Sequence, residues 1–461
     1  MAAGIIDYAY SEASKVSDGF TEAYTEEYSS IGAVIEQGKF NGIFSSNGSG
    51  IRVRLISKGN LYSMSTNLVN RASIRSMIHG AKGLPARKVS ISDEHAVKGK
   101  DIVKGRKEPD IDGIKDAILE IDRYLQDKRV KYRSVYINFS YTKSAFMNDC
   151  GSNIESRIPL LNVYANFIVS GKKGTRSRFM QLGGVGGLET LSMNALGHRL
   201  HNEISGLYEV AQNGKNLSAS EMRSIKNVVI SPEISGIAVH ESIGHPNESD
   251  RVFGREAAQA GTSYLNGDNL GLEIGSEAVT VVDEPQISSS NGYYKYDDEG
   301  VIGRKKIIIK KGMQNELLTN REYAAMLGTS SNGSARSSSY SVEPIVRMSN
   351  TYLQKGSATF EELVSEARDG IYVKSFNGWN IDDTRSFSMY QGNEAYMIRN
   401  GRIAEPVMNY KLETSTLKFW HAVDLVGKDF NLYLATCGKG EPEQGVPVTN
   451  GGASALLKFD R

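Results

Sequence analysis

The sequence predicts an α+β protein in which an N-terminal mixed α/β region of two small units precedes a mostly antiparallel β domain. Its 461 residues exceed what one hydrophobic core usually serves. With 47 glycines and 23 tyrosines but only 10 prolines, the composition favours strands and turns over a helical bundle. Short apolar stretches separated by turn residues become frequent after about residue 226. We therefore expect units at residues 1–112 and 113–225, and a β-rich domain at 226–461.

The first unit is expected to begin with a helix over residues 5–20 and to end with a helix over 68–81. Between them, apolar and polar residues alternate as they do in half-buried strands. Asn47-Gly48-Ser49-Gly50 predicts a turn between two of these strands. The predicted strands are 22–36, 40–44, 51–56 and 61–65.

Residues 96–115 form a polar stretch rich in Lys and Gly. We expect a solvated linker or surface loop, because runs of charge usually face water. A nucleic-acid patch is the alternative, but no aromatic residue is interleaved there to stack on bases.

The second unit is expected to begin with a helix over residues 114–125 and to end with a helix over 188–212. The cluster Gly183-Gly184-Val185-Gly186-Gly187 lacks the Lys-Ser/Thr pair of a phosphate-binding loop, so we interpret it as a flexible strand-to-helix turn. The predicted strands of this unit are 130–141, 160–170 and 176–182.

The sequence of the last domain predicts many short strands separated by turns, and such a pattern is typical of a closed or partly closed, mostly antiparallel β structure. A helix over residues 235–244 stands near its start, and a helix-like stretch over 360–367 interrupts it. The predicted strands are 228–230, 279–282, 307–309 within the stretch 301–310, 348–353, 371–374, 386–389, 394–398 and 431–435.

The overall charge excludes several classes of partner. The chain has 54 basic and 53 acidic side chains, a net charge of +1, so nothing favours binding to nucleic acid or to a membrane surface. Its two cysteines are too few for a disulfide framework, and the lack of such a framework is typical of proteins in a reducing compartment. Residues 1–21 lack the apolar core of a signal peptide, and no apolar run approaches the roughly 20 residues of a membrane span. We expect a cytoplasmic protein.

The stretch His240-Glu241-Ser242-Ile243-Gly244-His245 carries the most chemical information. Two imidazoles can hold a divalent ion, and the glutamate beside the first can take a proton from water. A histidine pair at this spacing is more often accidental than metal-binding. However, the chain has only seven histidines, and these two flank a glutamate. The stretch therefore indicates a metal-dependent hydrolase with Glu241 as general base.

The spacing of the two histidines is one residue longer than in the H-E-x-x-H motif. On an ideal helix, residues five apart are rotated by roughly 140° and lie about 7.5 Å apart along the axis, too far to share an ion easily. Gly244 and Pro246 both disfavour continuation of the helix. Unwinding at Gly244, or a π-bulge, would bring His245 back beneath His240.

A catalytic zinc site normally has three protein ligands. Glu248 and Asp250 are nearby acids, and Cys437 is the other candidate. Cys437 follows a predicted strand and stands on a glycine-rich turn, where the backbone can approach an ion closely. A cysteine in such a place is more often an inert apolar residue. With both histidines it would complete a His2Cys site, whereas Cys150 is interpreted as structural.

Four motifs follow one another over more than 200 residues. They are His240-Glu241-x-x-Gly244-His245, Asp297-Asp298-Glu299-Gly300, Arg347-Met348-Ser349-Asn350-Thr351-Tyr352, and Cys437-Gly438-Lys439-Gly440 with Gln444-Gly445-Val446-Pro447-Val448. In this order they resemble the TldD/PmbA family, from about residue 25 to the C-terminus. The chain retains the first motif and the late cysteine, so it is similar to the catalytic TldD type rather than to the partner type TldE, also called PmbA.

The resemblance implies a zinc-dependent peptidase that cleaves unstructured or linear peptides in an enclosed cleft. By this resemblance His240, His245 and Cys437 match the metal ligands, with one Zn²⁺ per active subunit, and Glu241 matches the catalytic glutamate. The resemblance also implies a peptide extended along a sheet, and a dimer formed with a second copy or with a TldE/PmbA-like subunit. A non-catalytic peptide-binding or assembly subunit is the alternative.

Two stretches depart from the family pattern and affect the expected substrate range: the residues after His245, and the glycine-rich run after Phe376, which is reduced to Asn377-Gly378-Trp379. Asp297-Asp298-Glu299-Gly300 lacks the spacing of a calcium loop, so we interpret it as a turn with a structural or substrate-facing role. The candidates for substrate or oxyanion binding, which the sequence does not rank, are Tyr293, Arg347 and His421, with Tyr294 and Tyr296.

Overall fold

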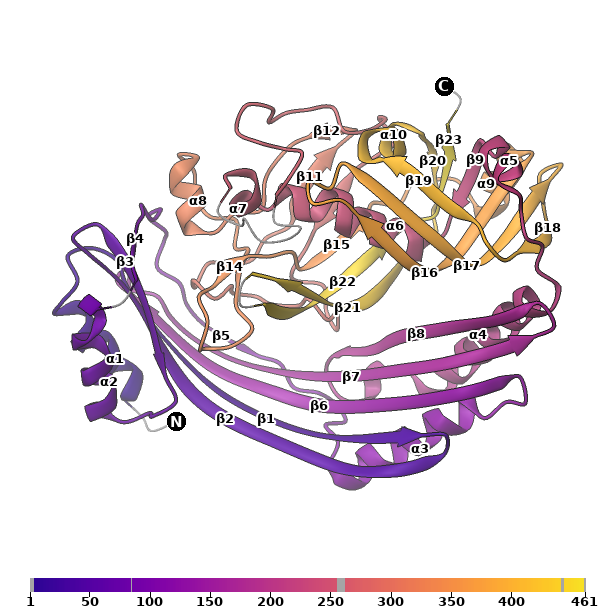
Figure 1. The fold of residues 1–461 in the computed structure, drawn as a ribbon. Helices are drawn as coiled ribbons and strands as arrows, with labels where there is room; N and C mark the ends of the chain where they lie inside the picture. The colour runs from indigo at the N-terminus through magenta and orange to yellow at the C-terminus, as the bar shows by residue number, and fades with distance from the viewer. Residues whose placement is uncertain (1–3, 84, 255–261, 441–442, 460–461) are drawn as a thin grey trace.

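The computed structural model describes residues 4–83, 85–254, 262–440 and 443–459. Figure 1 shows two layers: a long curved sheet from the N-terminal half, and the C-terminal half lying against the concave side of that sheet. Most of the strand pairs are antiparallel and helices accompany the sheets, so the predicted α+β class is confirmed. Within the described residues, no helix is long and apolar enough to cross a membrane.

The curved sheet has the strand order β4-β3-β2-β1-β6-β7-β5, with β8 also paired to β7. Its strands come from both sides of residue 112, so the two predicted N-terminal units share one sheet, and the boundaries at 112 and 225 stay a prediction. Its strands are β1 Thr21–Glu36, β2 Lys39–Ser57, β3 Asn60–Thr66, β4 Arg87–Lys88, β5 Lys98–Ile102, β6 Val130–Asn148, β7 Asn153–Gly171 and β8 Gly174–Val185.

The turn predicted at residues 47–50 is wrong, because β2 runs through these residues and pairs with β1 along its length. A Cβ atom on Gly48 would lie 2.5 Å from the Tyr28 ring, and one on Gly50 would lie 2.0 Å from the Tyr340 ring. These glycines therefore make room for aromatic rings that cross the strand. From the sequence alone, glycines with this role cannot be distinguished from the glycines of a turn.

Two further expectations for the N-terminal half need correction. The loop expected at residues 96–115 contains β5, which pairs parallel with β7, and the first residues of helix α3. The helix predicted over 5–20 ends at Ser14, because the chain must turn before β1; the Ser17 hydroxyl there donates a hydrogen bond to the Ile56 carbonyl.

Four helices pack on the curved sheet. Ile118 of α3 and Leu200 of α4 share one apolar core with Val135 and Val163 of the sheet. Side chains alternate along a strand, so Tyr136 and Tyr164 lie on the opposite face, toward the C-terminal half. The helices are α1 Ile5–Ser14, α2 Arg71–His79, α3 Ile111–Leu125 and α4 Met193–Asn213, with short 3-10 turns at Ala81–Gly83 and Leu188–Thr190.

Among the described strands of the C-terminal half, no sheet closes into a barrel. These strands form two large sheets and a separate pair, β13-β14, and helix α6 contacts strands of both large sheets. The first sheet has the order β12-β11-β10-β15-β22-β21 and the second β18-β17-β16-β9-β23-β20, with β19 paired to β17. A buried ion pair between Arg54 of β2 and Glu299, at 2.8 Å, joins this half to the curved sheet, which gives the Asp297–Gly300 motif a structural role.

The strands of the first C-terminal sheet are β10 Val281–Asp283, β11 Lys306–Lys310, β12 Met313–Gln314, β15 Asn350–Leu353, β21 Asn431–Lys439 and β22 Gln444–Gly452. Those of the second sheet are β9 Asn227–Ile230, β16 Gly370–Ile381, β17 Phe387–Arg399, β18 Arg402–Val407, β19 Lys411–Ser415, β20 Val423–Val426 and β23 Ala455–Lys458. The other elements are strands β13 Ala335–Arg336 and β14 Ile345–Val346, and helices α5 Ala219–Ser224, α6 Pro232–Val239, α7 Ser249–Val252, α8 Arg321–Met326, α9 Phe360–Ala367 and α10 Thr416–His421.

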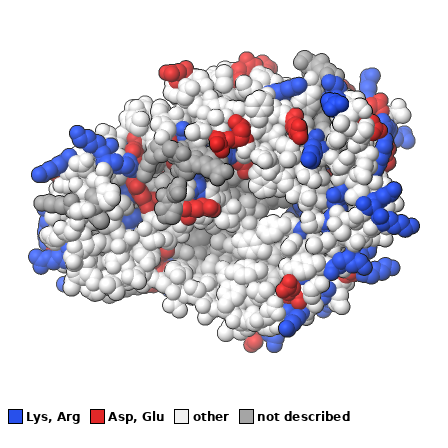
Figure 2. All heavy atoms as spheres, viewed as in Figure 1, with Lys and Arg blue, Asp and Glu red and all other residues white. Residues whose placement is uncertain are grey.

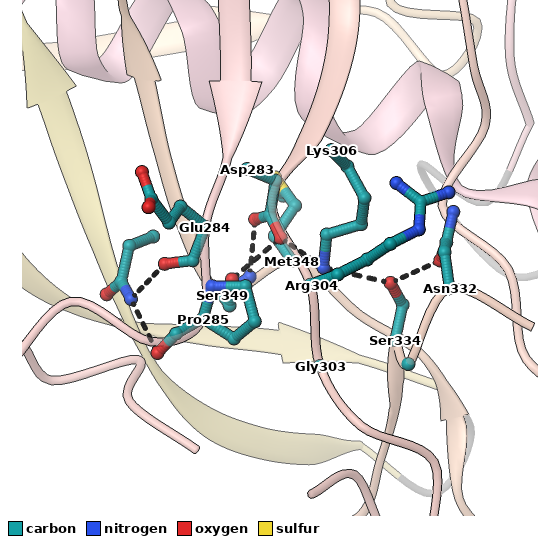
Figure 3. A network of polar contacts seen from close by, with 12 residues as sticks. Asp283, Glu284, Pro285, Gly303, Arg304, Lys306, Asn332, Ser334, Met348 and Ser349 are labelled. Carbon is teal, nitrogen blue, oxygen red and sulfur yellow. Dashed lines mark hydrogen bonds and ion pairs between the residues drawn. The ribbon is translucent and has the colours of Figure 1, made fainter. Parts of the chain in front are cut away.

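A buried ion pair holds the segment before β15 in place (Figure 3). Lys306 Nζ lies 2.7 Å from Asp283 Oδ1, and both side chains are fully buried. Asp283 also accepts hydrogen bonds from the backbone N–H and the hydroxyl of Ser349, each at 2.7 Å. Because Ser349 follows Met348, this network fixes a methionine that packs against the candidate site described below.

Replacing Lys306 with methionine is expected to lower the free energy of unfolding by about 3–5 kcal/mol, because it leaves the Asp283 carboxylate buried without its cation. Lys305→Met is the matched control. Lys305 is half-exposed and 3.6 Å from Glu284, so its loss should cost no more than about 1 kcal/mol. Urea denaturation of both variants measures the difference, and equal costs would contradict the role given to the buried pair.

Candidate metal centre

Helix α6 carries the first half of the site. The Ser231 side chain caps it by accepting hydrogen bonds from the N–H groups of Glu233 and Ile234, and Pro232 occupies its first turn. All eight residues of the helix are buried. Gly236 lets it approach β22, because a Cβ there would lie 2.7 Å from the Gly451 nitrogen.

The regular helix stops at Val239, and His240–Gly244 form one turn of π-helix. A 3-10 turn, His245–Asn247, follows and contains Pro246. The extra residue between the histidines is thus absorbed by the wider turn, as the sequence predicted. The two imidazole rings come together edge to face, with centroids 4.7 Å apart.

Gly244 is needed in the π-turn because Met348 packs directly against it. A Cβ on Gly244 would lie 2.0 Å from the Met348 sulfur, and Met348 is itself buried. The Arg347–Tyr352 motif therefore packs against the histidine motif through Met348, although about a hundred residues separate the two motifs.

Gly244→Ala is expected to destabilise the fold by about 1–3 kcal/mol through overpacking, and to lower zinc content by displacing His245. A double-mutant cycle with Met348→Ala tests the cause, because removing the obstructing side chain should make the double variant less damaging than the sum of the two single variants. Strict additivity in thermal unfolding would show that this contact is not the reason.

Three side chains converge at the π-turn: His240, His245 and, from β21, Cys437. One potential ligand atom from each lies within 4.8 Å of the others, and all three residues are buried. His245 Nε2 is 3.4 Å from Cys437 Sγ. Tetrahedral zinc with ordinary Zn–N and Zn–S bond lengths would hold two such atoms about 3.5 Å apart, so the spacing suits this ion.

The outer nitrogen of each imidazole is already engaged. His240 Nδ1 lies 2.8 Å from Asn450 Oδ1, and His245 Nδ1 lies 2.8 Å from Glu248 Oε2. An amide oxygen and a carboxylate can only accept, so each Nδ1 donates and each Nε2 keeps its lone pair toward Cys437. Histidine ligands of metals are commonly oriented in this way. The residues present therefore fit a zinc ion.

Electrostatics favour a thiolate at Cys437. Burial alone would raise the pKa of the Cys437 thiol, yet the two histidines and the Arg347 guanidinium hold this pKa well below its usual value. Burial would likewise lower the pKa of His240, but the adjacent sulfur raises it above the ordinary value. A deprotonated thiol beside two imidazoles is a donor set that attracts a borderline-soft divalent ion.

Glu241 is not among the grouped ligand residues, and its carboxylate is held by two residues of the β16–β17 hairpin. Its Oε1 accepts a hydrogen bond of 3.0 Å from the Trp379 indole, and its Oε2 forms an ion pair with Arg385. Trp379 is on β16, and Arg385 follows it in the loop before β17. Burial alone would raise the pKa of Glu241, but the two histidines and Arg385 hold it below its usual value, so the carboxylate is ionised.

The remaining candidates from the sequence have other surroundings. Arg347 is buried and donates to the carbonyls of Cys437 and Gln444. Tyr293 donates to Asp101, 3.1 Å away, and lines a different cavity. His421 is half-exposed and lies 3.9 Å from Glu273. Of the nearby acids, Glu248 holds His245, whereas Asp250 is paired with Lys439 at 2.6 Å.

Three residues that touch the site were not singled out for it by the sequence: Asn450, Trp379 and Arg385. Only Trp379 was noticeable in the sequence, because it ends the shortened glycine-rich run after Phe376.

The other two tyrosine candidates from the sequence have structural partners. Tyr294 donates to the Gly333 carbonyl at 2.7 Å, and Tyr296 packs with Tyr24 and Phe146.

A cavity between the two layers adjoins the site. Strand β21, which carries Cys437, is at the edge of its sheet, with β22 on one side only. A cavity of about 560 Å³ lies beside residues 433–436 of this strand and is also lined by Asn450 and Trp379. Its volume is within the range of about 300–1,000 Å³ found for small-ligand sites.

Residues 224–457 match the family described as the PmbA/TldA metallopeptidase C-terminal domain. The chain is 30% identical over 429 residues, 91% of each chain, to a metalloprotease of Methanocaldococcus jannaschii. It is 34% identical over 235 residues, 50% of each chain, to a zinc metalloprotease TldD homolog of Saccharolobus solfataricus. It superposes on TldE from Thermococcus kodakarensis with a TM-score of 0.75 at 16% identity, over 98% of this chain and 100% of the other. That identity shows a shared fold alone.

Proposed function

The chain belongs to the PmbA/TldD family of metallopeptidases, and from this premise we propose that it is a zinc-dependent peptidase of the TldD type. It hydrolyses unstructured or linear peptides in the cleft between its two layers. The observation that carries the proposal is the convergence of His240, His245 and Cys437, with the outer nitrogen of both imidazoles engaged.

His240 and His245 through Nε2, and Cys437 through its thiolate, are the residues that would hold zinc. When bound, zinc would acidify a water molecule and polarise the scissile carbonyl. Glu241 is placed next to the first ligand and is ionised, so it can accept the proton of the attacking water and pass it to the leaving amine. Trp379 and Arg385 orient its carboxylate.

The position of β21 supports a peptide substrate. An edge strand has backbone N–H and C=O groups on its free side, and an extended peptide can pair with them. Because such pairing uses backbone groups, it tolerates many side chains, and it demands that the substrate be unfolded. Cys437 on the same strand would then lie beside the bound peptide backbone.

We propose that the peptidase works as a dimer, with a second copy or with a TldE/PmbA-like subunit. Native mass spectrometry of the protein purified from its own cells distinguishes the two. A homodimer gives twice the mass of this 50.5 kDa chain, and a paralogous partner gives a second subunit mass.

The test of the function is cleavage of an unstructured, fluorescence-quenched peptide by the purified dimer. Cleavage should stop when a zinc chelator is added and return when Zn²⁺ is restored. Glu241→Gln protein, purified in parallel, excludes a contaminating protease. A dimer that contains zinc but cleaves no peptide would contradict the proposal and indicate the binding or assembly subunit instead.

A further inference from the structure

The 560 Å³ cavity beside the metal centre has walls from both layers of the molecule. The curved sheet contributes Tyr164 of β7 and Phe179 of β8. The C-terminal half contributes Ile237 of α6, Trp379 of β16 and Tyr433 of β21. Large apolar side chains from five separate elements thus surround one space.

The cavity adjoins the reacting centre. Trp379 lines it and donates a hydrogen bond to Glu241, while Asn450 lines it and holds His240. Ile237 stands one helical turn before Glu241, and residues four apart share a helix face. The cavity is therefore next to the point at which the scissile bond must lie in the proposed function.

The charged side chains in the cavity wall are largely satisfied by one another. Arg178 forms ion pairs with Glu233 at 2.6 Å and with Glu203 at 2.9 Å, and Arg199 lies over the Tyr433 ring. The paired charges of Arg178 and Glu233 therefore need no oppositely charged group on the occupant, and the exposed Arg199 contacts an aromatic ring. Figure 2 shows a hollow in the middle of the view with a mostly uncharged lower side, while Lys and Arg lie at both ends of the molecule.

Two aromatic side chains in the wall are open to solvent although they lie inside a cleft. Phe179 is 61% exposed and Trp379 is 45% exposed. The Phe179 ring is held in place by Tyr164, with centroids 5.8 Å apart, and Tyr164 in turn contacts Tyr136. A ring fixed on one side and exposed on the other can bury its open face only against an incoming group.

We propose that this cavity receives a large apolar side chain, foremost an aromatic one, from the substrate residue next to the scissile bond. The peptidase would then prefer peptides with such a residue at the cleavage site, even though backbone pairing along β21 ignores side chains. This inference rests on the proposed function for its link to cleavage, but the binding preference can be measured without turnover.

The test compares two labelled peptides of Gly and Ser that differ only in one central residue, Phe or Ala. Binding is measured by fluorescence anisotropy in the Glu241→Gln background, with zinc added, so that no peptide is cut. Phe179→Asp should weaken binding of the Phe peptide about tenfold by placing a charge where the ring docks, and should leave the Ala peptide unchanged. Phe179→Leu, which stays apolar, should keep most of the preference.

Leu68→Asp is the matched control, because Leu68 is 60% exposed and does not line the cavity. It should change neither affinity. If Phe179→Asp lowers the affinity for both peptides equally, or if the parent protein binds the two peptides with equal affinity, the pocket proposal is overturned. In the protein with Glu241 intact, mass spectrometry should map cleavage next to the Phe. A Phe preference in binding without any cleavage would overturn the peptidase function and leave the pocket standing.

Discussion

Replacement of Glu241 by glutamine is expected to reduce peptide cleavage by roughly 10²–10⁴-fold, the usual contribution of a general base, while zinc remains bound. The carboxylate is buried and ionised next to a ligand, is held by Trp379 and Arg385, and is not among the three side chains grouped as metal ligands. Glutamine has the same shape and can still accept from the Trp379 indole. It cannot take a proton from water.

Steady-state kinetics and elemental analysis of the same preparation check this result. Glu366→Gln is the control, because Glu366 is exposed on α9 and paired only with Lys458 among the described contacts. It should cleave at the parent rate. Cleavage by Glu241→Gln at the parent rate would remove Glu241 from the reaction, and loss of zinc from that variant would mean that it acts as a ligand.

Replacement of Cys437 by serine is expected to cost more zinc affinity than the roughly 10–100-fold lost when an outer hydrogen bond of a metal site is removed. The thiolate is one of three donors and is stabilised by both histidines and Arg347. A serine hydroxyl stays protonated at neutral pH, so it replaces a charged donor with a neutral one. Cleavage should fall in step with zinc occupancy.

Two comparisons make this result specific. Cys150→Ser removes the other cysteine, which contacts Arg321 and is not among the grouped ligand residues, and should leave zinc content unchanged. Asn450→Ala removes the hydrogen bond that orients His240. This variant should therefore lose only roughly 10–100-fold in zinc affinity, less than Cys437→Ser. Competition titrations with a zinc indicator rank the three variants. Parent-like zinc affinity in Cys437→Ser would exclude the thiolate as a ligand.

The local part of the site is predictable from sequence because its signals lie next to one another. Gly244 and Pro246 disfavour a regular helix, and the structure has a π-turn at this place. Strand β6 and helix α9 are predictable for the same reason: strong alternation over residues 130–141 in one, and a capping box from Thr359 to Glu362 in the other.

The surroundings of the site were not predictable, because they depend on contacts between distant segments. Asn450 lies 210 residues from His240, and Trp379 lies 138 residues from Glu241. A single asparagine or tryptophan in a strand carries no pattern that indicates its partner. The glycines of β2 were mispredicted for the same reason. The sequence around Gly50 predicts a turn, and only the structure shows that the Tyr340 ring packs over this glycine.

X-ray absorption spectroscopy at the zinc edge tests the central claim most directly. The zinc-loaded protein should show one sulfur at about 2.3 Å and two nitrogens at about 2.0–2.1 Å, the distances expected for two histidines and one cysteine. In the Cys437→Ser variant reloaded with excess zinc, the sulfur contribution should vanish. A zinc shell of nitrogen and oxygen alone in the unaltered protein would contradict the assignment of Cys437 and, with it, the proposed metal centre.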